Sequence, residues 1–157
     1  MAIGLLRDGK VEVKFAGRQN ERELLEWLRA ELKGCDCVVT WYGSKFDLPF
    51  ILSRAISLRV DMRELPKMRS IDLYDWCREY LKLSSYKLED VANFIGARRE
   101  VEFRGNDVHA LSLLAARGNK EAMAAITDHC KEDLILLKKI YEKLEPYLEV
   151  PRGEKVG

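Results

Sequence analysis

The stretch Thr40-Trp41-Tyr42-Gly43-Ser44-Lys45-Phe46-Asp47-Leu48-Pro49-Phe50 decides the fold expected for this chain. Residues 37–41 are apolar and β-branched and predict a short buried strand, while Pro49 suits the first turn of a helix. Asp47 therefore lies just beyond the carboxyl end of a strand, where open α/β sheets bind their ligands. The alternative interpretation is a helix N-terminal carboxylate that is favoured there by the helix dipole.

On the N-terminal side of this stretch the sequence predicts a β-hairpin and a helix. Residues 2–6 and 11–15 fit two strands, and Asp8-Gly9 between them is a strong signal for a two-residue turn. A helix is expected over residues 20–34, with Asn20 and Glu23 forming a capping box at its start.

On the C-terminal side the pattern becomes mostly helical. Residues 68–74 are ambiguous and fit a short strand that leads into a helix, and residues 98–104 fit a charged loop. Further helices are expected over residues 85–96, 107–117 and 120–144, the last of them capped by Asn119 and stopped by Pro146. The order of strands and helices indicates an α/β protein whose mixed sheet is covered by helices.

Two stripes at helical spacing run along the last helix. The first is apolar and is predicted to face the core: Met123, Ile126, Cys130, Leu134, Leu137, Tyr141 and Leu144. The neighbouring stripe is apolar except for His129 and Asp133, which lie one turn apart. A carboxylate beside a core face costs free energy unless a partner charge or a metal compensates it. The alternatives are a structural His–Asp pair on the helix surface at the edge of the core, or a buried aspartate that caps a neighbouring helix.

Length and charge limit the class of protein. The chain has 157 residues, with 27 Lys and Arg against 26 Asp and Glu, for a formal net charge of +1. This length suits one domain, expected over residues 1–150 and followed by a flexible tail at 151–157. A near-neutral chain is not expected to carry a broad cationic surface.

Other compositional features point to the protein's environment. No apolar run is long enough to span a membrane, so we expect a soluble, cytoplasmic protein. The four cysteines are expected to be core residues and not disulfide or metal ligands. A single glutamine, four asparagines and abundant charged residues are typical of heat-adapted, thermophile proteins.

Several segments resemble the DEDD (DnaQ-like) 3′–5′ exonucleases of the ribonuclease H-like superfamily, in the branch related to the exonuclease domain of family-B DNA polymerases. Residues 40–50 are similar to the second exonuclease motif, in which a metal-binding aspartate follows a strand. Residues 70–74, Ser-Ile-Asp-Leu-Tyr, are similar to the segment that comes next, and residues 118–122 and 128–133 are similar to the third motif region. The resemblance extends from about Ala2 to Leu148 and implies a ribonuclease H-like mixed sheet flanked by helices.

The resemblance implies a metal site and a catalytic residue. Asp47 and Asp133 would be ligands of Mg²⁺ or Mn²⁺. His129, four residues before Asp133, takes the place held by tyrosine in one branch and would orient or deprotonate the attacking water. The role of Asp72 is left open.

The resemblance also implies substrate contacts. Tyr42 stands where many relatives carry asparagine, and Lys45 and Arg54 are near enough to Asp47 in sequence to contact phosphates. The alternative interpretation is that Lys45 and Arg54 are ordinary solvated surface side chains with no role in binding. The implied partner is nucleic acid, with a single-stranded 3′ end as the substrate.

The first motif of the family, Asp-x-Glu on the first strand, is not found. No aspartate is followed two positions later by a glutamate, and the nearest acidic spacings are Glu21-Arg-Glu23 and Glu100-Val-Glu102. The hairpin over residues 2–15 corresponds to the strands that follow the first one in the family. We therefore expect the usual first central strand to be missing, which leaves two strand edges to be closed. The flanking strands, a second protomer in a homodimer or residues upstream of Met1 would close them.

Three functional hypotheses follow. The chain is a metal-dependent 3′–5′ exonuclease, N-terminally truncated or impaired; or it is an inactive ribonuclease H-like domain that binds nucleic acid or protein; or it is a dimerisation module with an open strand edge. Hydrolysis with two metals needs carboxylates that hold both ions about 4 Å apart. Two aspartates are therefore expected to recruit one ion weakly and not to support efficient catalysis.

Overall fold

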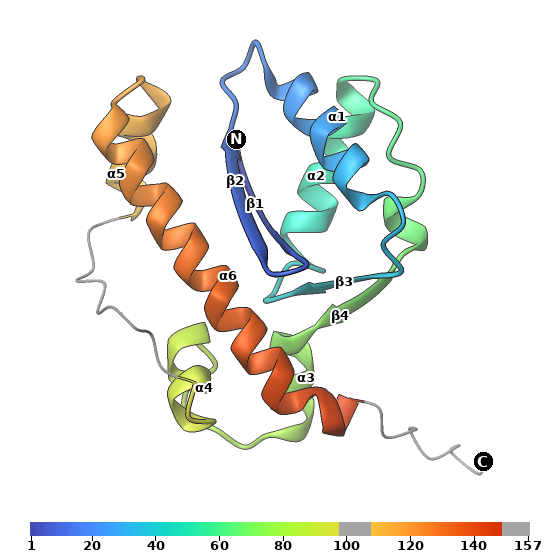
Figure 1. Ribbon diagram of the computed structural model, residues 1–157, viewed down its shortest axis with the longest axis vertical. Coiled ribbons are helices and arrows are strands. Elements are labelled where there is room, and N and C mark those ends of the chain that lie inside the picture. The colour runs from blue at the N-terminus through green and yellow to red at the C-terminus, as the bar shows by residue number, and fades with distance from the viewer. Residues whose placement is uncertain (98–107, 149–157) are drawn as a thin grey trace.

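The computed structural model describes residues 1–97 and 108–148 of the chain (Figure 1). The charged loop expected at 98–104, Glu100 and Glu102 within it, and the tail expected at 151–157 lie outside the described residues.

The chain begins with an antiparallel hairpin, as the sequence predicts. Strand β1 (Ala2–Arg7) pairs with β2 (Lys10–Phe15) along their whole length. Asp8 and Gly9 both have positive φ angles, 51° and 78°, which identifies the two-residue turn favoured between twisted strands.

The ambiguous segment before residue 74 forms a strand that continues directly into a helix. Strand β3 (Cys37–Thr40) pairs in parallel with β4 (Arg69–Asp72), so that Thr40 lies opposite Asp72. Within the described residues the two ladders form separate two-stranded sheets, and β1 does not pair with β3. This is the arrangement expected of a mixed α/β sheet that lacks its central strand, and it shows that the flanking strands do not close the gap themselves.

Six α-helices lie around the strands in the described part of the chain, together with a short 3₁₀ turn at Leu65–Lys67. They are α1 (Glu21–Leu32), α2 (Asp47–Ser57), α3 (Leu73–Tyr80), α4 (Leu88–Phe94), α5 (Val108–Ala116) and α6 (Lys120–Leu148). In Figure 1, α6 is a long rod that extends from α5 past the hairpin to α3 and α4. Contacts of α6 with β1, β2, α4 and α5 make it the element that joins the two ends of the molecule. No helix among the described residues is long and apolar enough to cross a membrane.

Three predictions about helix ends have different outcomes. Asn119 caps α6 through its Oδ1, which accepts a hydrogen bond from the Ala122 amide at 2.9 Å, as expected. The capping box at α1 was wrong: the Asn20 side chain makes no capping hydrogen bond, because its ψ of 12° is outside the extended region that capping requires. Pro146 does not stop α6, which continues to Leu148. A proline in the last turn removes only one backbone donor near the helix end.

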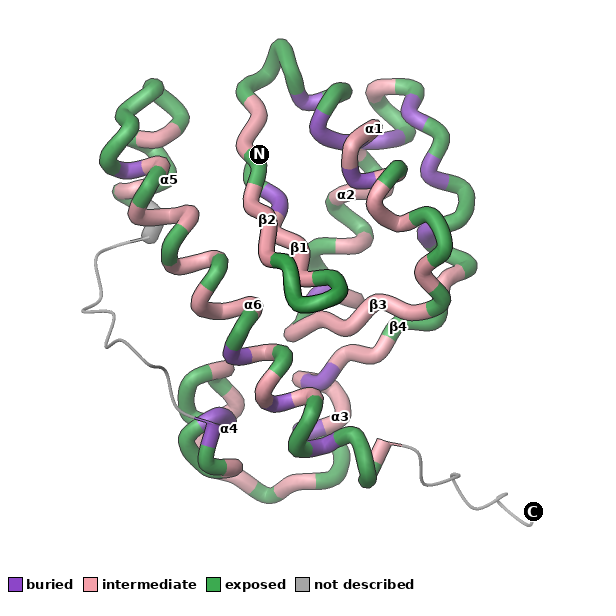
Figure 2. Tube along the Cα trace, in the orientation of Figure 1, coloured by how far each residue is buried: buried purple, intermediate pink, exposed green. Residues whose placement is uncertain are grey.

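The apolar core consists of two clusters, one at each end of the molecule (Figure 2). The first is built from the hairpin, α1, α2 and the segment after α2: Ile3, Leu24, Leu25, Leu28, Ala55, Val60, Met62 and Leu65. The second is built from α3, α4 and α6: Leu73, Cys77, Val91, Ala92, Ala97, Leu136, Ile140 and Leu144. The strands β3 and β4 lie between the two clusters, so the ends of these strands are held from both sides.

The face of α6 that is most buried differs from the one predicted. Its buried residues are Ala122, Leu136, Ile140 and Leu144. Three of them belong to the stripe that carries His129 and Asp133, whereas most of the stripe predicted to face the core is only half-buried. The difference arises because α6 is flanked by the hairpin and by α4 at once, so that it contacts protein on more than one face.

Candidate metal and nucleic-acid site

The turn between β3 and α2 fixes the position of Asp47. Tyr42 adopts a left-handed backbone conformation with φ of 61°, which is uncommon for a residue with a side chain. Gly43 is required for packing, because a Cβ atom there would lie 2.6 Å from the Cβ atom of Thr40. The Gly43 carbonyl accepts a hydrogen bond from the Leu48 amide at 2.8 Å and so leads the chain into α2, whose first residue is Asp47.

Asp72 holds this turn in place. One carboxylate oxygen accepts hydrogen bonds from the Tyr42 amide at 2.8 Å and the Tyr74 amide at 3.1 Å. The other accepts from the Ser44 amide at 3.0 Å and from the Ser44 hydroxyl at 2.7 Å. Burial acts to raise the pKa of Asp72, but the hydrogen bonds from Ser44 and Tyr42 outweigh it and the pKa is lowered. Asp72 is thus an ionised clamp with both oxygens engaged, which settles a role that the sequence left open.

Asp47 has a different electrostatic environment from Asp72. The residue is exposed and stands in the first turn of α2, but partial desolvation and then the charge of Asp72 raise the pKa of its carboxyl. The fold therefore works against the ionised form of Asp47, and a nearby cation would favour it.

The third acidic group comes from α6. His129 Nε2 lies 3.2 Å from Asp133 Oδ2, and both side chains are about one-third exposed or less. The thiol between them in sequence, Cys130, has its pKa raised by burial and then by the charges of Asp133 and Asp47. Because carboxylates from α2 and α6 both act on this thiol, the fold brings Asp47 and Asp133 into one region.

The two cations predicted to contact phosphates are each paired with a carboxylate. Lys45 Nζ lies 2.7 Å from Asp75 Oδ1 on α3, in an exposed pair. Arg54 donates from Nε and Nη2 to Glu21, at 2.8 and 2.5 Å, and hydrogen bonding from Arg54 lowers the pKa of that buried glutamate. Glu21 thereby links α1 to α2 and is structural, and not a substitute for a catalytic carboxylate.

Comparison with known proteins identifies the family of this chain. Residues 1–145 match the family model of the RNase_H superfamily. The chain belongs to the RNase_H superfamily.

Two DNA polymerases are similar to this RNase_H superfamily protein over parts of their length. The DNA polymerase of Methanocaldococcus jannaschii is 35% identical over 101 residues, covering 52% of this chain and 6% of the polymerase. The DNA polymerase catalytic subunit of Saimiriine herpesvirus 2 is 28% identical over 153 residues, covering 76% of this chain and 15% of that subunit. The chain thus spans a small fraction of the length of each relative. The family match confirms the ribonuclease H-like α/β fold expected from the sequence.

The described residues of this RNase_H superfamily protein include no group of three or more His, Cys, Asp or Glu side chains placed to hold a metal ion. Asp72 is near Asp47, but its oxygens are occupied by backbone and serine donors. A pair of ions would need more ligands than Asp47 and Asp133 supply.

The sequence did not identify every residue that shapes the site. Ser44 and Tyr74 are partners of Asp72 that only the parallel pairing of β3 with β4 brings together. The available signal was Asp72 directly before a helix, where aspartate is a favoured cap. The aromatic contacts of Tyr42, with Tyr74 at 4.9 Å between ring centroids, carry no sequence signal because they join separate elements.

Proposed function

We propose that this chain is a metal-dependent 3′–5′ exonuclease-type hydrolase that acts on nucleic-acid phosphodiester bonds at a single-stranded 3′ end, with low activity because part of the carboxylate set is missing. The observation that carries the proposal is the placement of Asp47 at the start of α2, directly after the β3–α2 turn, and of Asp133 beside His129 on α6. Membership of a nuclease-type superfamily and similarity to two DNA polymerases support it. A cytoplasmic location is part of the proposal, since the four cysteines are free thiols.

Asp47 and Asp133 would hold one Mg²⁺ or Mn²⁺ ion. The raised pKa of Asp47 supports this, because a cation beside it would offset both its partial desolvation and its repulsion from Asp72. When bound, the ion would neutralise phosphate charge and lower the pKa of a coordinated water.

His129 would act next to Asp133. The Nδ1 atom of His129 is buried, and Nε2 faces Asp133 Oδ2 at 3.2 Å. In this proposal Nε2 donates its hydrogen to the Asp133 carboxylate, and His129 orients the attacking water through that carboxylate and does not itself take the proton.

Several exposed side chains around Asp47 support nucleic-acid binding. Phe46 and Phe50 flank it, are 63% and 48% exposed, and stack in parallel with centroids 6.4 Å apart. Exposed aromatic faces bind unpaired bases by stacking. Lys45 would reach a phosphate by exchanging its exposed pairing with Asp75, because exposed ion pairs are worth little. A phosphate contact from Arg54 would require the buried Glu21 to lose its partner, which is the weaker part of the prediction.

A second candidate function is a non-catalytic module that binds nucleic acid or a protein. The specific observation in its favour is the incomplete carboxylate set, with no Asp-x-Glu in the sequence and no three-ligand group among the described residues. In this second candidate function the exposed aromatic residues still bind a ligand, but no phosphodiester bond is hydrolysed.

The deciding experiment is hydrolysis of a 5′-labelled single-stranded DNA oligonucleotide by the purified chain, with Mg²⁺ or Mn²⁺ and with a chelator. We expect slow, metal-dependent shortening from the 3′ end that is lost in Asp47→Asn and Asp133→Asn. Asp128→Asn is the matched control, because Asp128 is exposed on α6 one residue before His129. Binding of the oligonucleotide without any metal-dependent shortening would instead establish the non-catalytic module.

A further inference from the structure

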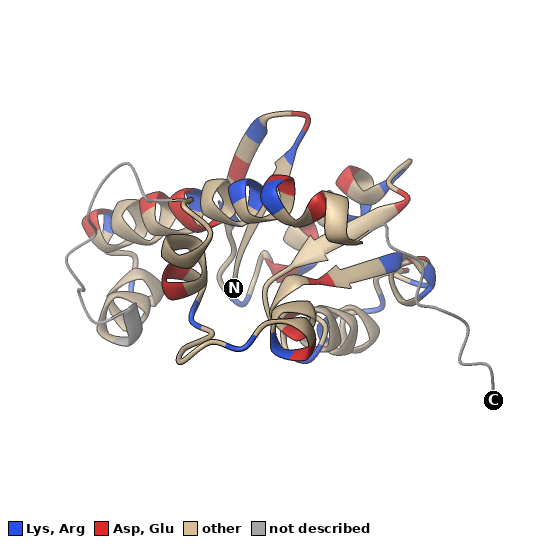
Figure 3. Cartoon of the chain, turned by 90° about the horizontal axis from the view of Figure 1, so that it is seen from below, with Lys and Arg blue, Asp and Glu red and all other residues tan. Residues whose placement is uncertain are grey.

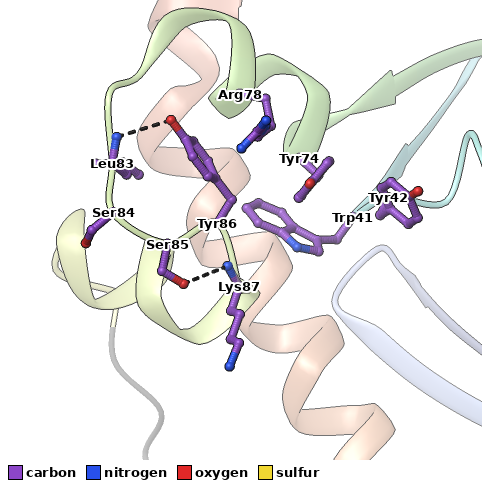
Figure 4. A pocket seen from close by; sticks show the side chains of 9 residues that line it. All are labelled: Trp41, Tyr42, Tyr74, Arg78, Leu83, Ser84, Ser85, Tyr86 and Lys87. Atoms are coloured by element: carbon purple, nitrogen blue, oxygen red, sulfur yellow. Dashed lines mark hydrogen bonds between the residues drawn. The ribbon is translucent and has the colours of Figure 1, made fainter.

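We infer that a cleft lined by Trp41 and Tyr42, at the start of the β3–α2 turn, is a second nucleotide-binding site. It would hold an unpaired nucleotide of the strand whose 3′ end lies at Asp47. This inference rests on the proposed function. The cleft has a volume of about 520 Å³ and is formed between the end of β3, α3 and the segment before α4 (Figure 4). The residues that carry the argument are Trp41, Tyr42, Tyr74, Arg78 and Tyr86.

Aromatic rings form one wall of the cleft. Tyr74 is in edge-to-face contact with Tyr42 at 4.9 Å and with Trp41 at 5.9 Å. In edge-to-face packing the edge of one ring meets a face of the other, and Lys45 Nζ lies 5.9 Å from the centre of the Tyr42 ring. Tyr42 is 46% exposed at the rim. Because Asp72 fixes the backbone of Tyr42, this ring is held in position before any ligand arrives.

Helix α3, which carries Tyr74, also supplies a positive charge in a fixed position. The Arg78 guanidinium lies 4.7 Å from the centre of the Tyr86 ring. That ring is itself anchored, since its hydroxyl donates to the Leu81 carbonyl at 2.7 Å and accepts from the Leu83 amide at 3.1 Å. In Figure 4 the Arg78 side chain extends toward the Tyr86 ring, on the side of the cleft where Tyr74 also lies.

The charge of the cleft is not neutralised locally. Its lining includes two cations, Arg78 and Lys87, and no Asp or Glu. Among the described residues neither of these cations lies in an ion pair. This contrasts with Lys45 and Arg54, which both have carboxylate partners, and with the chain as a whole, where acidic and basic residues are interspersed (Figure 3).

These features together select an unpaired nucleotide as the occupant. A base needs an exposed aromatic face and its phosphate needs a guanidinium with available donors, and the cleft offers both. Tyr42 lies in the turn that leads into α2 at Asp47, so in this proposal a strand whose 3′ end lies at Asp47 continues toward the cleft. A peptide could pack against the aromatic rings, but only an acidic peptide would supply a negative charge to pair with the Arg78 guanidinium.

The test is fluorescence anisotropy of a labelled 12-nucleotide oligothymidylate with the purified chain in EDTA, which removes hydrolysis from the measurement. Tyr42→Gly removes the ring and tolerates the positive φ, and we expect it to weaken binding by about 5- to 100-fold. Arg78→Gln is expected to weaken binding and to reduce the slope of log Kd against log salt by about 0.7.

Matched controls separate the cleft from general loss of charge or aromatic surface. Tyr147→Ala removes a 64% exposed tyrosine on α6, and Arg22→Gln removes an exposed arginine on α1; neither residue lines the cleft, and both variants should bind like the parent chain. Unchanged melting temperatures would exclude unfolding as the cause of weaker binding.

Failure of this inference can be told apart from failure of the proposed function. If the cleft variants bind normally while Asp47→Asn abolishes hydrolysis, the second site is refuted and the exonuclease proposal remains. If the parent chain neither binds nor cleaves the oligonucleotide, both are refuted. Binding of a proline-rich peptide that depends on Tyr42, with no binding of the oligonucleotide, would assign the cleft to a protein partner and refute the inference.

Discussion

Replacing Asp72 by alanine should destabilise the fold by about 2–4 kcal/mol. The Asp72 carboxylate accepts four hydrogen bonds, three from backbone amides and one from the Ser44 hydroxyl, with lengths between 2.7 and 3.1 Å. A hydrogen bond to a charged group contributes about 1.5–3 kcal/mol when buried, and loss of a helix cap costs about 1 kcal/mol. The total is smaller than the sum, because the Tyr42 amide is exposed and regains a hydrogen bond from water.

The assay is thermal and urea denaturation followed by circular dichroism. For a chain of this size a loss of 2–4 kcal/mol lowers the melting temperature by roughly 5–15 °C. Asp72→Asn keeps one acceptor oxygen and should lose about half as much free energy. Asp75→Ala is the control, since Asp75 lies on the same helix and makes an exposed ion pair with Lys45 that is worth less than about 1 kcal/mol.

The pH dependence provides a second check on Asp72. Its pKa is lowered in the folded state, so its contribution to stability is complete above the unfolded pKa of about 4 and is lost as pH falls through the folded value. The difference in unfolding free energy between the parent chain and Asp72→Asn should therefore shrink below about pH 4. A loss of less than about 0.5 kcal/mol at pH 7 would refute the clamp and leave the role of Asp72 open again.

Two other predictions concern the same site. Gly4→Ala should destabilise the fold by about 1–3 kcal/mol, because its Cβ atom would lie 2.4 Å from Cys130 Sγ, and Gly4→Ala combined with Cys130→Ala should recover part of that loss in urea denaturation. Asp47→Asn should raise the unfolding free energy at pH 7, since the fold raises the pKa of Asp47 and so penalises its ionised form, and the gain should vanish below about pH 4, where the carboxyl is protonated in both states. The first expectation would be contradicted if the losses of unfolding free energy from Gly4→Ala and Cys130→Ala were fully additive in the double variant. The second would be contradicted if Asp47→Asn lowered the unfolding free energy at pH 7.

The sequence predicted local structure well where a single segment contains its own signals. The Asp8-Gly9 turn, the strand before Gly43 and the cap at Asn119 are decided by residues within a few positions of one another, and the structure confirms all three. The resemblance to one superfamily, carried by residues 40–50 and the last helix, is confirmed in the same way.

The sequence predicted less where the outcome depends on contacts between distant elements. Helical periodicity located two stripes on α6 but identified the wrong one as the more buried, because burial there is decided by the hairpin on one side and α4 on another. Arg54 was expected near phosphate on the basis of its distance from Asp47 in sequence, whereas α1 supplies Glu21 as its partner. The role of Asp72 likewise depended on its register opposite Thr40, which no local pattern encodes.

Asp47 and Asp72 show how the fold gives two neighbouring carboxylates different electrostatic environments. Asp72 is the last residue of β4, and Asp47 follows β3 across a turn. Hydrogen-bond donors surround Asp72 and its pKa is lowered, whereas Asp47 is partly desolvated beside a like charge and its pKa is raised. A carboxylate kept ionised at a cost in free energy is one that a cation can stabilise. The turn at residues 41–46 therefore does two things: it uses Asp72 to fix its own shape, and it presents Asp47 in an environment where a cation would stabilise its ionised form.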